Sequence, residues 1–539
     1  MDKPTLIKLA IGAAATVLVN VGVVYALLAF GVELRSACAW AAFGTYVVLT
    51  SGLALYGMRK TKDFSSFALG DRDMGPSLVG ITLAAAIAST ATFVINPGFV
   101  YAHGVSALMH LGVAANLGAI TALVLFSRGF RRLGEKTRAL TLPHWIGARY
   151  GHRGMRTFFA LANLLLAISF VVLIVKGSAL VMQHTLGLSY WVSVLTIVGF
   201  VFSYILMGGT YAHVFTNAFQ GSLMIVVALA IVGTGAHLLG DGPLAIVSPA
   251  GWSHLMDQLA AQDPNLVSPV NESSSLFGTA FDVYLCGFVV GAGLMCQPHI
   301  LTKSLYLKRE GDLGRYLVVA SVIGVTFALV LLAGLFARVV SPTIEQADAV
   351  MPIYLSQAFG PVTGVLVSVA LLAAGMSTLD GLLVGASTIA ANDLVLGPIG
   401  ERLLTTKSEE ARQSIALKAS RWILIAMGVL SALLALDPPQ LVGIFAQVGI
   451  YGLVAASLAP IACGIFVKDL DARAVFAAAI VGLVVHFAYY LGSVYGLGEV
   501  IPPARSATVA MFASFGVLAV LEGARRLVRR SSIGATVAR

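Results

Sequence analysis

Two adjacent hydroxyl side chains, Ser377 and Thr378, lie inside a long apolar segment, shortly after Gly375. Hydroxyl and carbonyl oxygens are hard donors, which suit a hard cation such as Na⁺. The glycine allows a neighbouring helix to approach closely and to add its own oxygens. The alternative is structural, because Ser and Thr in membrane helices commonly bond back to a carbonyl four residues earlier or bridge two helices. The pair is therefore a candidate cation site.

Two charged side chains also fall within apolar segments, where an ionisable group is costly and usually functional. Asp380 comes shortly after the hydroxyl pair, and it either lines an ion's exit path or sits solvated near the membrane surface as a helix cap. Lys176 lies within the stretch VVLIVKGSALVM. Its long side chain either extends outward to the interface or faces the core as a counter-charge for a carboxylate solute.

Polar side chains beside proline form a third group: Thr92 and Asn96 near Pro97, and Gln297 before Pro298. Proline removes a backbone donor, so a membrane helix is locally unwound there. Side chains at such breaks either contact a solute or satisfy the freed backbone. We predict solute contacts at Thr92, Asn96 and Gln297.

Membrane-spanning helices are the elements that would position these groups. Of the 539 residues, 58% are apolar and 11% are charged, whereas soluble domains carry about 25% charged residues. A soluble enzyme and a nucleic-acid-binding protein are thereby excluded. The apolar runs have the length of a bilayer-crossing helix rather than of an alternating barrel strand. We predict an all-α polytopic protein with about fourteen spans: 9–30, 36–58, 76–100, 104–126, 157–183, 189–207, 214–239, 278–303, 316–338, 357–391, 420–437, 441–467, 472–492 and 506–523.

The basic residues predict how these spans are oriented. All of the 34 Lys and Arg except Arg35, Lys176, Arg338 and Arg505 fall in loops or tails assigned to one face. The longest loop on the other face, 240–277, contains Asp and Glu but no Lys or Arg. The positive-inside bias then predicts a plasma (inner) membrane protein with that loop outside and both termini in the cytoplasm. The run 9–30 is too long for a signal-peptide core and is predicted to be a retained helix.

Helix breaks recur at 95–98 in the third span and at 291–299 in the eighth. Because the odd number five separates these two spans, the second set of spans enters the membrane from the opposite side, which is typical of an inverted repeat in a transporter. The alternative is that membrane helices are simply rich in Gly and Pro. We divide the chain into five parts: 1–75 (an extra helix, the helix that follows it and a cytoplasmic loop), 76–239 (first repeat), 240–277 (outer loop), 278–467 (second repeat) and 468–539 (last helices and basic tail).

Six segments follow one another in a characteristic order: RKTKDFSSFALGDRDMGP (59–76), TATFVINPG (90–98), LMGGTYAHVFTNAFQG (206–221), GAGLMCQPHI (291–300), MSTLDGLLVGASTIAANDL (376–394) and DPPQLVGIFAQVGIYGL (437–453). Together they resemble the sodium:solute symporter family, which includes proline, pantothenate, acetate and sugar cotransporters. The resemblance extends from about residue 36 to residue 467. It implies a LeuT-type core built of two inverted five-helix repeats.

The resemblance also implies a Na⁺ site and an ion path. The ligands that it implies are two side-chain hydroxyls and three backbone carbonyls: Ser377 and Thr378, with Ala85, Ala88 and Ala374. Asn217 stands where many members carry an aspartate thought to assist sodium release, so the ion path is assigned to Asn217 and Asp380. The neutral amide of Asn217 leaves both Na⁺ and H⁺ coupling open.

We therefore predict a sodium-coupled secondary active symporter that takes up a small carboxylate or amino-acid-like solute by alternating access. A sugar is disfavoured, because Val289 and Ala292 stand where sugar-transporting members place polar or aromatic contacts. Two alternatives stay open: a proton-coupled or uncoupled permease of the same fold, and a symporter-like solute sensor.

An enzyme is not predicted, because the spans contain no paired carboxylates, nucleophile–base pair or metal-binding HxxxH or HExxH motif. The predicted partners are the solute, Na⁺ as the coupling ion and the lipid bilayer. No ATP, nucleic acid or further cofactor is expected.

Overall fold

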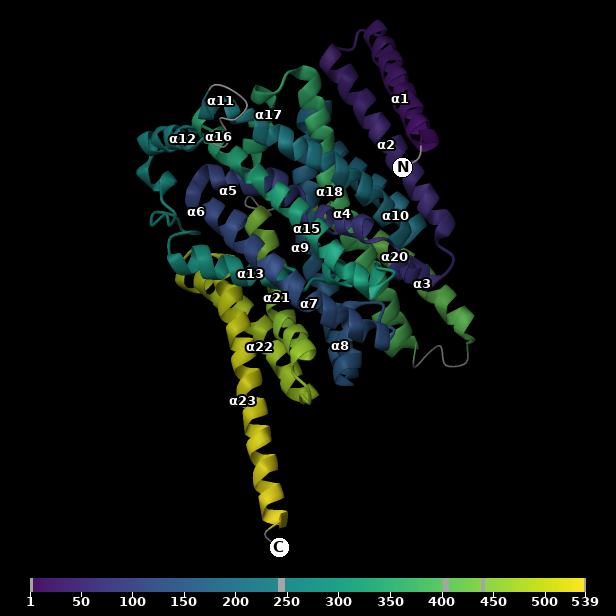
Figure 1. Ribbon diagram of the computed structural model, residues 1–539, viewed down its shortest axis with the longest axis vertical. Coiled ribbons are helices and arrows are strands. Elements are labelled where there is room, and N and C mark those ends of the chain that lie inside the picture. Colours follow the sequence, from purple (N-terminus) through teal and green to yellow (C-terminus); the bar gives the residue numbers. More distant parts are fainter. Residues whose placement is uncertain (1–2, 241–247, 401–406, 438–441, 538–539) are drawn as a thin grey trace.

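The computed structural model describes residues 3–240, 248–400, 407–437 and 442–537 (Figure 1). Its regular structure is helical, and the β-pairing found in these residues is one isolated bridge between Met74 and Leu307. The predicted all-α class is therefore confirmed. Residues 241–247 of the predicted outer loop lie outside the described residues.

The helices along the chain, several of which are labelled in Figure 1, have the following bounds. They are α1 (Lys3–Ala29), α2 (Leu34–Lys60), α3 (Phe64–Leu69), α4 (Pro76–Ile87), η2 (Ala91–Ile95), α5 (Asn96–His103), α6 (Val105–Leu108), η3 (Met109–Ala114), α7 (Ala115–Lys136), α8 (Leu142–Tyr150), α9 (Arg153–Leu186), α10 (Tyr190–Thr234), α11 (Ala236–Leu239), α12 (Pro249–Gln262), η6 (Phe281–Cys286), α13 (Gly287–Leu294), α14 (Pro298–Leu301), η7 (Thr302–Tyr306), α15 (Leu313–Ala328), α16 (Leu332–Val340), η10 (Ala347–Ala349), α17 (Val350–Ala358), α18 (Pro361–Ile389), η11 (Ala390–Ile399), α20 (Glu409–Leu436), α21 (Val442–Phe466), α22 (Ala472–Leu491) and α23 (Pro503–Val537).

Ten helices in the described ranges are long and apolar enough to cross a membrane, and two bent helix pairs raise the number to twelve. The predicted number of fourteen spans is therefore not confirmed. The remaining two predicted segments, 9–30 and 189–207, correspond to α1 and to the first part of α10, which contain the apolar stretches Thr16–Ala29 and Tyr190–Leu206. The second of these ends at a kink inside α10, where Gly209 adopts φ 53° and ψ −137°. Only glycine adopts that conformation without strain.

The first helix break lies at Ala88–Thr90 rather than at the predicted 95–98. Helix α4 ends at Ile87, Ala88 is extended, and the chain bends by 55° before it continues through η2 into α5. Pro97 does not unwind the chain: it lies in the first turn of α5, directly after the π-helical turn η2, and the helix continues from Ala91 to His103.

The second break falls within the predicted stretch, at its carboxyl end. Helix α13 ends at Leu294, α14 begins at Pro298, and the bend is 64°. Gly291 stays helical, contrary to the expected unwinding. A Cβ there would lie 2.0 Å from the carbonyl oxygen of Ala115, so this glycine permits close packing of α13 against α7.

Long helices make up most of the molecule, and the short elements α4, α5, α6 and α13 lie in its middle part (Figure 1). Helices α11, α12 and α17 gather at one end, while α3 and α8 lie toward the other (Figure 1). Helix α18 packs against α9, α10 and α4, which brings residues 377–380 beside the first helix break. The predicted division into inverted repeats remains a prediction.

Candidate functional site

The Ser377 hydroxyl links α18 to the broken helix α4. It lies 2.9 Å from the carbonyl oxygen of Ala85 and 2.9 Å from that of Ala374, and it is fully buried. The last helical bond of α4 runs from the Ala88 N–H to the Ala84 carbonyl. The Ala85 carbonyl, one residue further on, therefore faces a side chain from 292 residues away. Three of the predicted ligand groups are thus brought together.

The neighbouring Thr378 hydroxyl is buried and has no hydrogen-bond partner in the described part of the chain. The amide of Asn217 on α10 is also buried, and neither its nitrogen nor its oxygen has a hydrogen-bond partner in the same described residues. Buried polar atoms in native proteins nearly always have a partner, and an exception requires an explanation such as an ion or water. These orphaned oxygens indicate that α10 and α18 are built to contact something polar.

Gly375 makes this arrangement possible by its small size. A Cβ at this position would lie 2.0 Å from the Ser178 hydroxyl of α9 and 2.5 Å from the Thr90 hydroxyl of the first break. Those two hydroxyls are 3.2 Å apart and hydrogen-bonded. The glycine therefore lets α18 approach both partners closely.

We expect Gly375→Ala to destabilise the protein by about 1–3 kcal/mol, the usual cost of overpacking a core. Gly364 on the same helix is the matched control, since the nearest atom to a Cβ there is 3.7 Å away. Gly364→Ala is expected to be neutral or stabilising by up to about 1 kcal/mol. Thermal unfolding of both variants in detergent measures the difference, and equal effects would contradict the packing argument.

Asp380 belongs to a fully buried chain of ionisable groups. Its carboxylate accepts a hydrogen bond from Nδ1 of His213 at 2.8 Å, and Nε2 of His213 lies 2.9 Å from the Nζ of Lys303. The other carboxylate oxygen accepts from Thr216 at 3.1 Å and from Tyr204 at 3.3 Å. Because a carboxylate accepts and an ammonium donates, the geometry assigns the imidazole proton to Nδ1.

Lys303 corrects one prediction made from the sequence. It was grouped with the loop cations, yet it is fully buried and also donates to the His299 carbonyl at 2.9 Å. It is the last residue of the predicted span 278–303 and lies on η7, whose residues are buried as far as Tyr306, so the buried core continues past that span. The sequence signal was its position three residues after the QPHI stretch.

Lys176 lies against a carboxylate near one end of the helix bundle. Its ammonium donates to Asp348 on η10 at 3.0 Å, and both side chains are mostly buried. Lys176 is not among the described residues that line the cavity beside the first break, which is described below. The carboxylate that neutralises Lys176 in this structure is therefore that of Asp348 and not that of a solute.

A second ion pair lies at the opposite end, where α18 continues into η11. Arg156 of α9 contacts the buried Asp393 at 2.6 Å, and Thr141 donates to the same carboxylate at 2.5 Å. His144 on α8, outside the spans, lies beside Asn392. Burial and the nearby Arg156 guanidinium lower the pKa of His144 to about 4, so it is neutral at pH 7.

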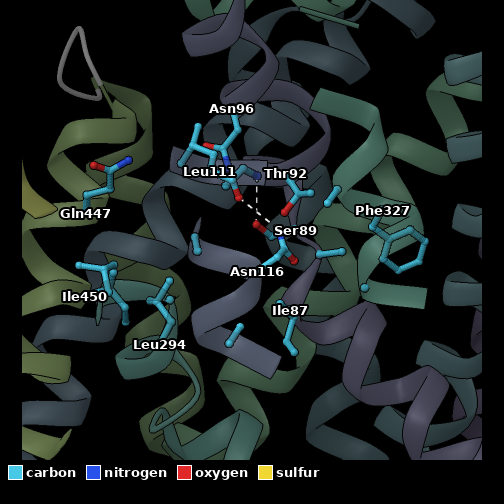
Figure 2. A pocket seen from close by; sticks show the side chains of 18 of the residues that line it. Ile87, Ser89, Thr92, Asn96, Leu111, Asn116, Leu294, Phe327, Gln447 and Ile450 are labelled. Atoms are coloured by element: carbon cyan, nitrogen blue, oxygen red, sulfur yellow. Dashed lines mark hydrogen bonds between the residues drawn. The ribbon is translucent and has the colours of Figure 1, made fainter. Parts of the chain in front are cut away.

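A cavity of about 190 Å³ lies beside the first break (Figure 2). Thr92 and Asn96 line it, as predicted for solute contacts, together with polar groups that the sequence analysis missed: Ser89, His110, Asn116, Gln447 and Tyr451. In Figure 2, Ser89 and Asn116 lie near the middle, with Gln447 and Phe327 on opposite sides. Ala88 also lines the cavity, so the cavity borders the region of the predicted cation ligands.

Gln297 lies apart from this cavity. It borders a small space of about 20 Å³ with Asn163 and His299, and its side-chain oxygen is buried without a partner in the described chain. The structure therefore brings Thr92 and Asn96 together in one cavity but not Gln297. Spacing along the sequence could not show that Gln297 lies apart. The chain bends at both helix breaks, and residues next to a bend face different sides.

Comparisons with known proteins give a consistent result. The family model described as "Sodium:solute symporter family" matches residues 67–482. The sodium/pantothenate symporter of Haemophilus influenzae is 28% identical over 448 residues, covering 81% of this chain and 87% of the relative. The sodium/proline symporter of Staphylococcus aureus (strain Newman) is 25% identical over 381 residues, covering 68% of this chain and 70% of the relative.

Among solved structures, the substrate-bound outward-open state of a Na⁺-coupled sialic acid symporter has a similar fold. Its TM-score is 0.71 at 18% sequence identity, and the match covers 90% of this chain and 97% of that chain. At this identity the likeness concerns the fold alone.

Proposed function

Because the chain belongs to the sodium:solute symporter family, we propose that it uses a sodium gradient to take up a small carboxylate or amino-acid-like solute by alternating access. Like the members of its family and its relatives, it is a membrane transporter and not an enzyme. In this proposal the core consists of two inverted five-helix repeats. The two bent helix pairs at matching places support this arrangement.

The observation that carries the proposal is the oxygen cluster at the first helix break. Na⁺ would bind to the hydroxyls of Ser377 and Thr378 and to the carbonyls of Ala85, Ala88 and Ala374. The unpartnered Thr378 oxygen and the two carbonyls within 2.9 Å of Ser377 support this ligand set. Uncharged hydroxyl and carbonyl oxygens are hard donors that bind Na⁺ weakly enough for it to dissociate. Since the ligands come from α4 and α18, bound Na⁺ would hold these helices together.

The buried chain from Asp380 to Lys303 provides an inward route for the ion. Asp380 lies two residues after Thr378, and within the described residues hydrogen bonds connect it through His213 to Lys303 of the second bent pair. If the η7 segment moved away, the carboxylate would lose its nearest buried cation and would attract Na⁺ leaving the oxygen cluster. Asp380 and the amide of Asn217 therefore form the proposed ion path.

The central cavity supports a small solute bound next to the ion. Its volume of about 190 Å³ is below the roughly 300–1,000 Å³ of typical drug-sized pockets. No Asp, Glu, Lys or Arg among the described residues lines it. A solute carboxylate there would be bound by hydroxyl and amide groups such as those of Thr92 and Asn96 and by Na⁺ itself. In this proposal Gln297 contacts the solute only after the second break rearranges, and Lys176 does so only after its ion pair with Asp348 opens.

The orientation proposed is both termini in the cytoplasm of the plasma membrane. The concentration of Lys and Arg in the loops of one face supports it, and bacterial relatives such as the Haemophilus influenzae symporter support the choice of membrane.

Uptake into proteoliposomes under separate Na⁺ and H⁺ gradients tests the coupling. Candidate solutes are first ranked by the thermal stabilisation that each gives with and without Na⁺, since a ligand stabilises by RT ln(1 + [L]/Kd). We expect Na⁺ to stabilise the protein and to increase uptake of a carboxylate or amino-acid-like compound. The second candidate function is a proton-coupled or uncoupled permease, which the neutral Asn217 favours. Uptake that follows the H⁺ gradient and ignores Na⁺ would establish it instead.

A further inference from the structure

A second, larger cavity of about 570 Å³ is lined by residues at the end of α2, in α3 and in α20. The end of α2 lies near α3 and α20 in Figure 1. None of the residues that line this second cavity borders the cavity of Thr92 and Asn96. We call it the basic groove and define it by Lys62, Asp63, Lys418, Arg421, Trp422 and Ile425. Neither the ion site nor the solute site uses these residues.

Three cations converge on the basic groove from two separate segments. Lys62 follows the end of α2, whereas Lys418 and Arg421 lie nearly one turn apart on α20. In the described ranges, none of these three side chains forms an ion pair. The one carboxylate in the lining, Asp63, already accepts bonds from the N–H and hydroxyl of Ser66 as a helix cap. The groove therefore carries a net positive charge that is available to an anion.

An apolar strip leads away from these cations along α20. Trp422, Ile425 and Val429 recur at intervals of three and four residues, so they share one helix face. Their exposed fractions are 71%, 41% and 56%, respectively. A Trp between a charged zone and an apolar zone is typical of the membrane–water interface. The strip offers a surface for acyl chains directly beside the cationic pocket.

We propose that the basic groove binds the phosphate headgroup of an anionic phospholipid, whose acyl chains lie along Trp422, Ile425 and Val429. A free phosphate would meet the same cations but would leave the apolar strip uncovered, so the combination favours a lipid. Assignment to the inner leaflet rests on the proposed orientation, in which the basic loops are cytoplasmic. The bound lipid would tie α3 to α20, and α20 packs against η11 at the end of α18.

The test compares lipid retention by the purified full-length protein in native mass spectrometry. Phosphatidylglycerol is the probe, with phosphatidylcholine and free glycerol 3-phosphate as the other two arms. Each Lys or Arg near an anionic lipid contributes about 1 kcal/mol, so K62Q/K418Q/R421Q is expected to weaken phosphatidylglycerol binding on the order of a hundred-fold. The charge-preserving variant K62R/K418R/R421K is expected to retain it.

The matched control, K468Q/R473Q/R526Q, removes three exposed cations that do not line the groove. It is expected to bind phosphatidylglycerol like the wild type. Equal losses in both triple variants, or no loss in either, would overturn the proposal. Binding of glycerol 3-phosphate as tight as that of the lipid would also overturn it, in favour of a soluble phosphate.

Fluorescence locates the lipid independently. Brominated phosphatidylglycerol is expected to quench the emission that is lost in W422F, and to do so more strongly than brominated phosphatidylcholine. Equal quenching by the two lipids would contradict a specific site. Since both measurements use purified protein without transport, they can fail or succeed independently of the proposed symport.

Discussion

Thr378→Val is expected to abolish Na⁺-stimulated uptake while leaving the ion-free protein as stable as the wild type. Valine has nearly the shape of threonine, and the Thr378 hydroxyl has no partner among the described residues, so the ion-free fold loses no hydrogen bond. A polar contact to a charge contributes about 1.5–3 kcal/mol, which corresponds to a loss of Na⁺ affinity of about ten- to a hundred-fold. The Na⁺ dependence of thermal unfolding and of uptake in proteoliposomes measures both effects.

Two further variants on α18 make this experiment specific. Ser377→Ala removes the contacts to the Ala85 and Ala374 carbonyls, so it is expected to lower both the ion-free stability and the Na⁺ response. Thr388→Val removes only a bond to the Val384 carbonyl, so the Na⁺ response should remain. A Thr378→Val protein with the wild-type Na⁺ response would refute the proposed ligand set.

Lys303→Met is expected to be the most destabilising single change in the buried ionisable chain. Removing one partner of a buried ion pair leaves an uncompensated charge and costs about 3–5 kcal/mol. Here the stranded group is Asp380, which is fully buried and separated from Lys303 by His213 alone. In the double variant Lys303→Met/Asp380→Asn no charge is stranded, so we expect it to be more stable than Lys303→Met by about 2 kcal/mol or more.

The double-mutant cycle also tests the proposed ion path. Asp380→Asn alone is expected to keep the stabilisation by Na⁺ but to slow turnover, because the ion would lose its attraction toward the inward route. The pair Lys176 and Asp348, which is partly open to water, is the control and is expected to show a smaller coupling. Additive effects at Lys303 and Asp380 would mean that the two groups do not form one unit.

The ion pairs at the two ends of the bundle suit alternating access. Lys176–Asp348 joins α9 to η10 at one end, and Arg156–Asp393 joins α9 to η11 at the other. Both pairs include α9, so in the proposed alternating access a rocking of the elements around this helix would break one pair at a time.

The sequence by itself predicted the helical membrane class, the family and, among the implied Na⁺ ligands, Ser377, Ala85 and Ala374, which the structure brings together. These depend on local properties: the length of the apolar runs, the hydroxyl pair after Gly375 and the order of six short segments. It also located the second break at 291–299, because proline there removes a backbone donor in the middle of an apolar run.

Tertiary structure decided which polar groups meet. Pro97 predicted unwinding but lies in the first turn of α5, and the first break lies at Ala88–Thr90. The Ser377 hydroxyl meets the Ala85 carbonyl just before that break. The sequence placed Lys303 among the loop cations, whereas the structure places it in the core, where it contacts His213. A local pattern encodes whether a segment is apolar or breaks a helix, whereas the partner of a buried polar group comes from residues far away in the chain and is determined only by how the helices pack.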